Sequence, residues 1–343
     1  MLEKVSRFFG RVANFFKRAG KLVLALTGNK YYRKKLVNIL TGKGKDSEID
    51  SADILKRKEL FQDFYRDFFG NIIHSTYSET LSADSSQFDG YDYVIAGSDQ
   101  VWNPELVGTF EALRYFYLEF VEKEKRVNYA PSFGVSRLKF LERHVHREGL
   151  NGFTRLSCRE KEGCDLIREL TGRDAQLVLD PTFLLTAEQW RKIERKPEYE
   201  VPEHYALTYF LGEAEMSTAK KLAGELPIIQ APDGTAQIYS MTGPREFVWL
   251  IDHADLVITA SFHGTAFSVN FGRRFITFKG GNWFSRMKTL LSNLGLTDRI
   301  FELGRDDDRN NIADMPIDYE AVNVKLAELR KKSMNYLASC LGK

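Results

Sequence analysis

The turn SFHG at residues 261–264 combines a histidine with a glycine between an apolar run, DLVITA, and a helical segment, GTAFSVNFG, whose helix is predicted to begin near Thr265. Free histidine titrates near pH 6.5, so His263 at such a turn can donate or accept a proton near neutrality. The backbone N–H groups of Gly264, Thr265 and the following alanine are predicted to point outward at the helix start and bind an anion, with Ser261 beside them. The alternative is a structural histidine without a chemical role.

A second polar group, Ser98, Asp99 and Gln100, follows the apolar run YDYVIAG. Three hydrogen-bonding side chains at the carboxyl end of a strand suit recognition of a polar ligand, and Asp99 adds a carboxylate. The alternative is a helix cap formed by Ser98 or Asp99, with Trp102 as a packing anchor.

The third group lies in LSCREKEG, where Arg159 and Glu160 follow another short apolar run. The planar guanidinium of Arg159 can bind a carboxylate with two parallel hydrogen bonds. A solvated run of charges is the alternative for this segment.

The elements that must position these groups are short apolar runs separated by helical stretches, the pattern of parallel sheets with crossover helices. The runs are YDYVIAG, RVNYAP, TRLSCRE and AQLVLDP in one series, and HYALTYFL, PIIQA, DLVITA and RFITF in a second. The sequence therefore predicts an α/β protein with two Rossmann-like domains that face a cleft, with ligands at the carboxyl ends of the strands.

The predicted division has four parts: a basic amphipathic helical segment at 1–45, an N-terminal domain at 46–196, a C-terminal anion-binding domain at 203–310, and a C-terminal helix at 311–343. A helical stretch from Ala52 to Phe69 is expected to pack on the N-terminal domain.

The start of the chain concentrates positive charge, with ten Lys or Arg against the single acid Glu3 among residues 1–35, although the whole chain has a formal net charge of only +2. Basic and Phe-rich sides at helical spacing allow two interpretations. The segment is either a helical connection packed on the protein or a peripheral contact with an anionic membrane.

The sequence lacks the motifs that identify several other functional classes. The chain lacks GxGxxG, GxxxxGK[ST], HExxH and GxSxG, and its three cysteines form neither a disulfide framework nor a CxxC metal site. His144 and His146 are predicted on different faces of a helix, and Asp306 to Asp308 as a solvated loop, so no metal site is predicted. We expect a cytoplasmic protein, with the inner membrane face as an alternative, and no nucleic-acid partner.

Taken together, the segments resemble the polysaccharide pyruvyl transferase family. The sequence segments that carry the resemblance lie between about Tyr91 and Ile300. They are YDYVIAGSDQVWNPE, RVNYAPSFG, LSCREKEG, VLDPTFLLTAEQW, GPREFVWLIDHADLVITASFHGTAFSVNFG, NWFSRMKTLL and LGLTDRI. The resemblance implies a fold like that of B-type glycosyltransferases, phosphoenolpyruvate as donor, a glycan or lipid-linked sugar as acceptor, and no metal or organic cofactor. It also implies that Arg159 holds the donor carboxylate and that His263 is the acid.

Ketal formation needs an acid, anion ligands and a base. His263 is expected to protonate phosphoenolpyruvate, the amides after it to stabilise phosphate, and Asp99 to accept a hydroxyl proton or hold the sugar, with Glu160 as an alternative. Many family members have Arg two residues before the equivalent of His263, where this chain has Ser261. Arg286 is the candidate that replaces it.

The family usually opens with a strand, an Asn-Tyr-Gly loop, a helix and a second strand, and none of these is recognised before Tyr91. The sequence therefore predicts an incomplete first domain. Two competing functions remain: a B-type glycosyltransferase that uses a nucleotide sugar, and a truncated inactive relative.

Overall fold

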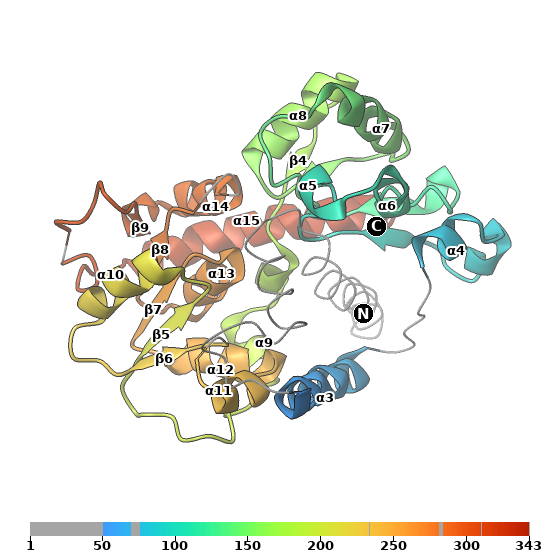
Figure 1. Cartoon of the computed structure of the whole chain (residues 1–343). Coiled ribbons are helices and arrows are strands. Elements are labelled where there is room, and N and C mark those ends of the chain that lie inside the picture. The colour runs from blue at the N-terminus through green and yellow to red at the C-terminus, as the bar shows by residue number, and fades with distance from the viewer. Residues whose placement is uncertain (1–50, 70–75, 233, 281–283, 310, 343) are drawn as a thin grey trace. The chain divides into compact units, whose positions relative to one another are not determined.

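The computed structural model describes residues 51–69, 76–232, 234–280, 284–309 and 311–342 (Figure 1). The basic segment predicted at 1–45 lies outside these residues, so both interpretations of it stay predictions. The chain divides into two compact units. The described parts of the first unit come from Phe68–Pro181 and Leu329–Lys343, and those of the second from Asp46–Asp67 and Thr182–Glu328.

The second unit contains a five-stranded parallel sheet in the order β6-β5-β7-β8-β9. Its strands are β5 (Ala206–Tyr209), β6 (Ile228–Gln230), β7 (Leu256–Thr259), β8 (Phe275–Phe278) and β9 (Ile300–Phe301). β7 and β8 are buried along their whole length, as expected for central strands covered on both faces.

Helices cover both faces of this sheet. Leu222 and Ala223 of α10 (Glu213–Ala223) share a hydrophobic cluster with Leu256 and Ile258 of β7. Side chains alternate between the two faces of a strand, so the neighbouring Thr259 lies on the opposite face. There it meets α13 (Phe262–Phe271), because a Cβ added to Gly264 would lie 2.6 Å from the Thr259 Oγ1.

The other helices of the second unit connect these strands or pack beside them. They are α3 (Ser51–Phe68, to Asp67 in this unit), η3 (Pro181–Leu184, from Thr182), α9 (Ala187–Arg191), α11 (Ala236–Ser240), α12 (Pro244–His253), α14 (Ser285–Leu294), η4 (Thr297–Arg299) and the first part of α15 (Tyr319–Cys340).

The first unit contains two short parallel pairs, β1 (Val94–Ala96) with β2 (Arg126–Asn128), and β3 (Ser157–Cys158) with β4 (Gln176–Leu177). Asn128 links the pairs, because its Oδ1 accepts a hydrogen bond from the Ser157 amide at 2.8 Å. The helices of this unit are α4 (Tyr77–Leu81), η1 (Ser85–Phe88), α5 (Pro104–Val107), α6 (Phe110–Phe116), η2 (Lys123–Lys125), α7 (Phe140–Asn151) and α8 (Lys161–Thr171). The predicted α/β class with parallel strands is confirmed, whereas the cleft and the likeness to B-type glycosyltransferases stay predictions.

The unit boundaries differ from the predicted domains at both ends. The helix α3 was expected to pack on the N-terminal domain, but its contacts lie in the second unit: Arg57 donates to the Tyr239 carbonyl at 3.1 Å, and Asp67 pairs with Arg245. The end of α15 belongs to the first unit, where the Ser333 hydroxyl accepts from the Leu179 amide at 2.9 Å. Contacts between residues more than 150 positions apart decide both assignments, and local periodicity does not report on them.

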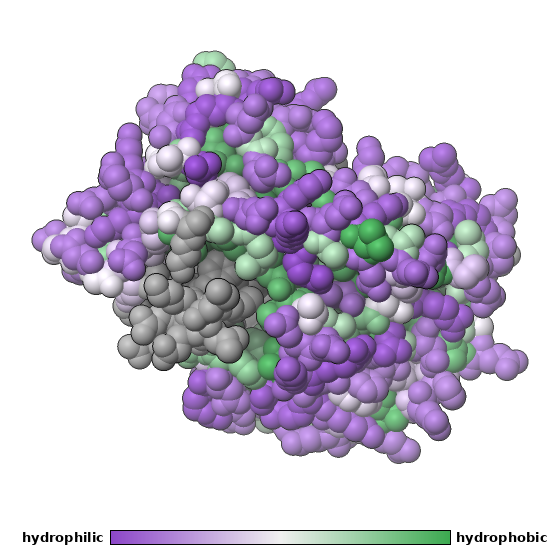
Figure 2. Space-filling view, turned by 180° about the vertical axis from the view of Figure 1, so that it is seen from behind, coloured by the Kyte–Doolittle hydropathy of each residue, from purple (hydrophilic) through white to green (hydrophobic). Residues whose placement is uncertain are grey.

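Hydrophilic residues cover most of the face shown in Figure 2, with apolar residues scattered among them. Within the described residues, no helix combines the length and the apolar composition that crossing a membrane requires.

Candidate functional site: strand-end polar groups in each unit

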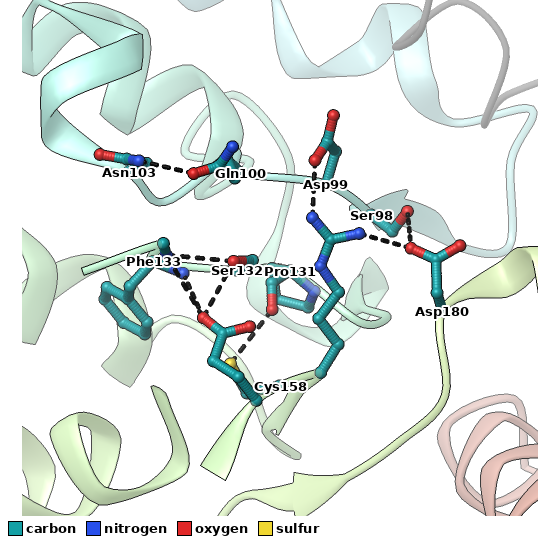
Figure 3. A network of polar contacts seen from close by, with 12 residues as sticks. Ser98, Asp99, Gln100, Asn103, Pro131, Ser132, Phe133, Cys158 and Asp180 are labelled. Carbon is teal, nitrogen blue, oxygen red and sulfur yellow. Dashed lines mark hydrogen bonds and ion pairs between the residues drawn. The ribbon is translucent and has the colours of Figure 1, made fainter. Parts of the chain in front are cut away.

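In the first unit, the carboxyl ends of parallel strands bring polar groups from four distant segments together (Figure 3). Ser98 and Asp99 follow β1, the loop 130–134 follows β2, Arg159 and Glu160 follow β3, and Asp180 follows β4. The strands run in the same direction, so their carboxyl ends meet at one edge. The sequence predicted this edge as a ligand site.

The turn after β1 depends on Gly97. Its φ is +118°, and an added Cβ would lie 2.1 Å from the Tyr129 carbonyl oxygen. Only glycine permits this close approach of two backbone segments. Asp99 follows with φ of +61°, a left-handed conformation that aspartate tolerates better than most residues, and its carbonyl accepts from the Ser132 amide at 2.8 Å.

Arg159 lies between two carboxylates. One terminal nitrogen donates to Asp180 Oδ2 at 2.5 Å and the other to Asp99 Oδ1 at 2.6 Å. The Arg159 side chain is 1% exposed, the Asp180 side chain 0% and the Asp99 side chain 27%. Burial lowers the pKa of the Arg159 guanidinium, but Asp99, Asp180 and Glu160 outweigh it, and the pKa is raised. Arg159 is therefore a buried cation that two carboxylates hold.

Glu160 is turned toward the loop after β2. Its Oε1 accepts from the Ser132 hydroxyl and the Phe133 amide, both at 2.9 Å, and from the Gly134 amide at 3.3 Å. The residue is fully buried. A carboxylate that accepts several backbone N–H bonds holds the loop in one conformation. In this structure Glu160 therefore orders the loop, and the sequence expectation that it binds substrate stays a prediction.

The other predicted site residues of this unit, Ser98 and Gln100, form hydrogen bonds at the same edge of the sheet. The Ser98 hydroxyl, 1% exposed, donates to Asp180 at 3.5 Å, and the Gln100 Oε1 accepts from the Asn103 amide group at 2.8 Å. Asn103, rather than Ser98 or Asp99, caps the following helix α5. Trp102 is fully buried and stacks on the Tyr117 ring with centroids 5.2 Å apart, as the packing interpretation predicted.

In the second unit, α13 starts three residues earlier than predicted. Ser261 is the N-cap, so His263 lies in the first turn of the helix and not before it. The Gly264 amide donates to the Ser261 hydroxyl at 3.5 Å and the Thr265 amide to the Ser261 carbonyl at 3.1 Å. Two of the three amides that were expected to point outward are thus bonded to the cap. The third, on Ala266, lies beyond the first four N–H groups that a helix leaves unbonded.

The side chain of Thr265 is also turned inward. Its hydroxyl lies 2.8 Å from the Thr277 hydroxyl of β8, and the residue is fully buried. Arg286, in the first turn of α14, lies close to the start of α13, because its guanidinium carbon is 5.7 Å from the centroid of the Phe262 ring. The ring of Phe262 also meets that of His263, with centroids 5.5 Å apart. His263 and Arg286 therefore both lie beside the ring of Phe262.

One group of potential metal ligands occurs among the described residues: Glu194, Asp252 and His253 have ligand atoms within 4.8 Å of one another. Both Asp252 oxygens already accept hydrogen bonds from guanidinium groups, from Arg191 at 2.7 and 2.9 Å and from Arg273 at 2.9 Å. Two adjacent cations disfavour a metal ion at this position. We interpret the group as an ion-pair cluster.

Asp180 and Ser132 were not predicted as site residues from the sequence. Asp180 was visible as the acid in VLDP, directly after an apolar run, which is the same signal that identified Asp99. Ser132 follows the run RVNYAP in the same way. Both residues occupy strand ends, so the rule that found the other groups applies to them as well.

The chain is similar to a known protein family and to a solved structure. The model of the family named "Polysaccharide pyruvyl transferase" matches residues 24–282, and so begins upstream of Tyr91, where the resemblance was expected to start. Among solved structures, the UDP-GlcNAc 2-epimerase of Methanocaldococcus jannaschii is 13% identical, with 78% of this chain and 81% of that chain covered and a TM-score of 0.40. Such a likeness is too weak to carry an argument about this chain. No curated protein matches the chain.

The family match spans well over half of the chain and includes every strand from β1 to β8, the groups around Arg159, and His263. The chain belongs to the polysaccharide pyruvyl transferase family.

Proposed function

We propose that this protein transfers a pyruvyl group from phosphoenolpyruvate to a pair of hydroxyl groups on a sugar of a surface polysaccharide or its precursor, with release of phosphate. The observation that carries the proposal is a histidine in the first turn of a helix after a central parallel strand, in a chain of the pyruvyl transferase family. No metal or organic cofactor is required for the proposed reaction.

The reaction begins with a proton transfer to carbon. Protonation of the methylene carbon of phosphoenolpyruvate makes a methyl group and leaves a cationic centre at the neighbouring carbon. One sugar hydroxyl adds to this centre and loses its proton to a base. The bond to the phosphate oxygen then breaks, phosphate leaves, and the second hydroxyl closes the ketal. The protons of the two hydroxyls balance those on the new methyl group and on the released phosphate.

His263 is the acid in this scheme. Its imidazole lies at the start of α13, where the helix dipole is positive and favours an anionic group such as phosphate. Arg286 beside Phe262 adds a cation at the same helix start. The Gly264 and Thr265 amides are already hydrogen-bonded to Ser261. In this proposal the helix dipole and Arg286 therefore stabilise the departing phosphate.

Asp99 is the base for the hydroxyl proton. Its side chain is the exposed member of the carboxylates around Arg159, and in Figure 3 one of its oxygens points away from the guanidinium. A carboxylate within hydrogen-bond reach of a hydroxyl can accept its proton as the oxygen attacks. Arg159 was expected to hold the donor carboxylate, but both of its terminal nitrogens are already bonded.

The test is phosphate release from phosphoenolpyruvate with a panel of glycan repeat units, compared between the wild type, His263→Ala and the control His204→Ala. His204 belongs to the same unit, but its side chain is 73% exposed. We expect His263→Ala to reduce turnover by about 10²-fold or more with an unchanged melting temperature, because a general acid contributes that much. His204→Ala is expected to keep wild-type turnover.

Donor binding separates this function from its competitors. Phosphoenolpyruvate is expected to raise the melting temperature, since a ligand that binds only the folded state stabilises it. Stabilisation by nucleotide sugars instead would support the glycosyltransferase alternative. A His263→Ala protein with wild-type turnover would remove the central assignment.

A further inference from the structure

The arrangement around Arg159 does not suit a ligand for an incoming carboxylate. A guanidinium binds a carboxylate through its terminal nitrogens, and in Arg159 each of these already contacts an aspartate at 2.5 or 2.6 Å. The side chain is also 1% exposed. A donor carboxylate could reach it only by displacing Asp99 or Asp180, and separating a buried charge from its partner is costly. Arg159 is better suited to hold its two aspartates than to hold substrate.

The two aspartates differ in exposure. Asp180 is fully enclosed at the end of β4, whereas the Asp99 side chain is 27% exposed at the end of β1. Asp180 therefore lies at the buried end of a chain of charges, Arg159 in its middle, and Asp99 at the end that solvent and substrate can reach. Figure 3 labels Asp99 and Asp180, the two ends of this chain of contacts.

The backbone around Asp99 is held independently of its side chain. Its carbonyl accepts from the Ser132 amide at 2.8 Å, and Ser132 donates its hydroxyl to the buried Glu160 at 2.9 Å. With the backbone held in this way, the hydrogen bond from Arg159 at 2.6 Å fixes one oxygen of the Asp99 carboxylate. The other terminal nitrogen of Arg159 is fixed by Asp180 at 2.5 Å.

We propose that Asp180 is a positioning residue, which acts through Arg159 to orient the Asp99 carboxylate toward the sugar hydroxyl. This inference rests on the proposed function and assigns Arg159 a different role from the donor ligand expected from the family resemblance. The alternative is an ion pair that only stabilises the fold. The second unit contains a matched control for that alternative, since Asp252 is equally buried and pairs with Arg191 and Arg273.

The kinetic test compares Asp180→Asn, Asp99→Asn, the double variant Asp99→Asn/Asp180→Asn, and the control Asp252→Asn in the full chain. We expect Asp180→Asn to lower kcat about tenfold or more while the KM for phosphoenolpyruvate stays within about twofold, because a misplaced base slows the chemical step without weakening donor binding. Asp252→Asn is expected to keep the wild-type kcat per folded protein. Since Asp180 acts through Asp99, the double variant should be no slower than Asp99→Asn alone.

Two kinetic results would overturn the inference: a kcat of Asp180→Asn equal to that of Asp252→Asn, or a double variant slower by the product of the two single effects. A raised KM of Asp180→Asn for phosphoenolpyruvate with an unchanged kcat would instead support Arg159 as a ligand of the donor carboxylate. These outcomes require an active wild type. A wild-type protein that releases no phosphate with any acceptor contradicts the proposed function instead.

A second measurement does not depend on activity. In thermal unfolding of the same variants, the melting temperature of the double variant should fall by more than the sum of the two single decreases. Arg159 keeps one aspartate partner in each single variant and keeps neither in the double variant. Additive losses would show that Arg159 does not couple the two aspartates, and would overturn the inference without any turnover assay.

Discussion

The buried imidazole of His146 makes the stability of the first unit sensitive to mild acid. His146 is fully buried on α7, and its Nδ1 lies 2.5 Å from the Tyr117 hydroxyl. Burial raises the pKa of Tyr117 well above its usual value, so the phenol stays uncharged, and its hydroxyl and Nδ1 share one hydrogen bond. The Nε2 has no hydrogen-bond partner among the described residues. A second proton on this ring would place a cation in the core.

The size of the effect follows from the pKa of this group in each state. Burial lowers the pKa of His146 to about 3, while an unfolded histidine titrates near 6.5. Below pH 6.5 the unfolded state binds a proton that the folded state does not bind. The free energy of unfolding therefore falls as the pH drops from about 6.5 toward 3. The slope is about 1.4 kcal/mol per pH unit, or about 2 kcal/mol between pH 6.5 and 5.

Urea unfolding at pH 7.5, 6.5, 5.5 and 5.0 measures this dependence, with His146→Gln as the test and His144→Gln as the control. Glutamine retains an acceptor for the Tyr117 hydroxyl but does not titrate. His144 lies on the same helix with its side chain 71% exposed. We expect His146→Gln to lose about 2 kcal/mol less than the wild type over this range, and His144→Gln to follow the wild type. Parallel curves for the wild type and His146→Gln would refute the reasoning.

Two further predictions concern packing at α13 and the start of the chain. Gly264→Ala should destabilise the protein by about 1–3 kcal/mol in urea unfolding, because the new Cβ would lie 2.6 Å from the Thr259 Oγ1. The Thr259 hydroxyl is held in place, since it donates to the Tyr209 carbonyl at 2.7 Å. Gly90→Ala, with open space around it, is the control, and equal losses of stability in the two variants would contradict the prediction. The basic segment at 1–45, if it contacts membranes, should sediment the protein with anionic vesicles at low salt and lose this binding at high salt, since each basic residue near such a surface contributes about 1 kcal/mol. Equal recovery with neutral and anionic vesicles would favour the packed connection.

Much of the fold was predictable because its strands are apolar runs that end in Gly, Pro or a charged residue. Of the nine strands in the described part of the chain, eight fall inside runs identified from the sequence, and the ninth, β9, has two residues and no such run. Helix starts were less certain. α13 begins at Phe262 because Ser261 is its cap, whereas the pattern placed the start near Thr265. A cap depends on the geometry of one residue, which hydrophobic spacing does not report.

The candidate site was predictable as a set of residue types at strand ends, but not as a set of contacts. Asp99, Arg159 and His263 were identified because each follows an apolar run. Their partners were not, because Asp99 and Arg159 are 60 positions apart and Arg159 and Asp180 are 21 apart. The predicted absence of a first strand stays a prediction, since residues 1–50 lie outside the described part of the chain.

The sequence by itself determined the α/β class, the edge of the sheet where polar groups collect, and the family, because apolar spacing and short motifs are local properties that survive without coordinates. Only the tertiary structure decided which partners each polar group has. It places Arg159 as a buried cation between two carboxylates and directs Thr265 and Glu160 inward. The physical reason is that the role of a charged or polar group depends on its burial and its partners, and both are set by which strand ends meet in space.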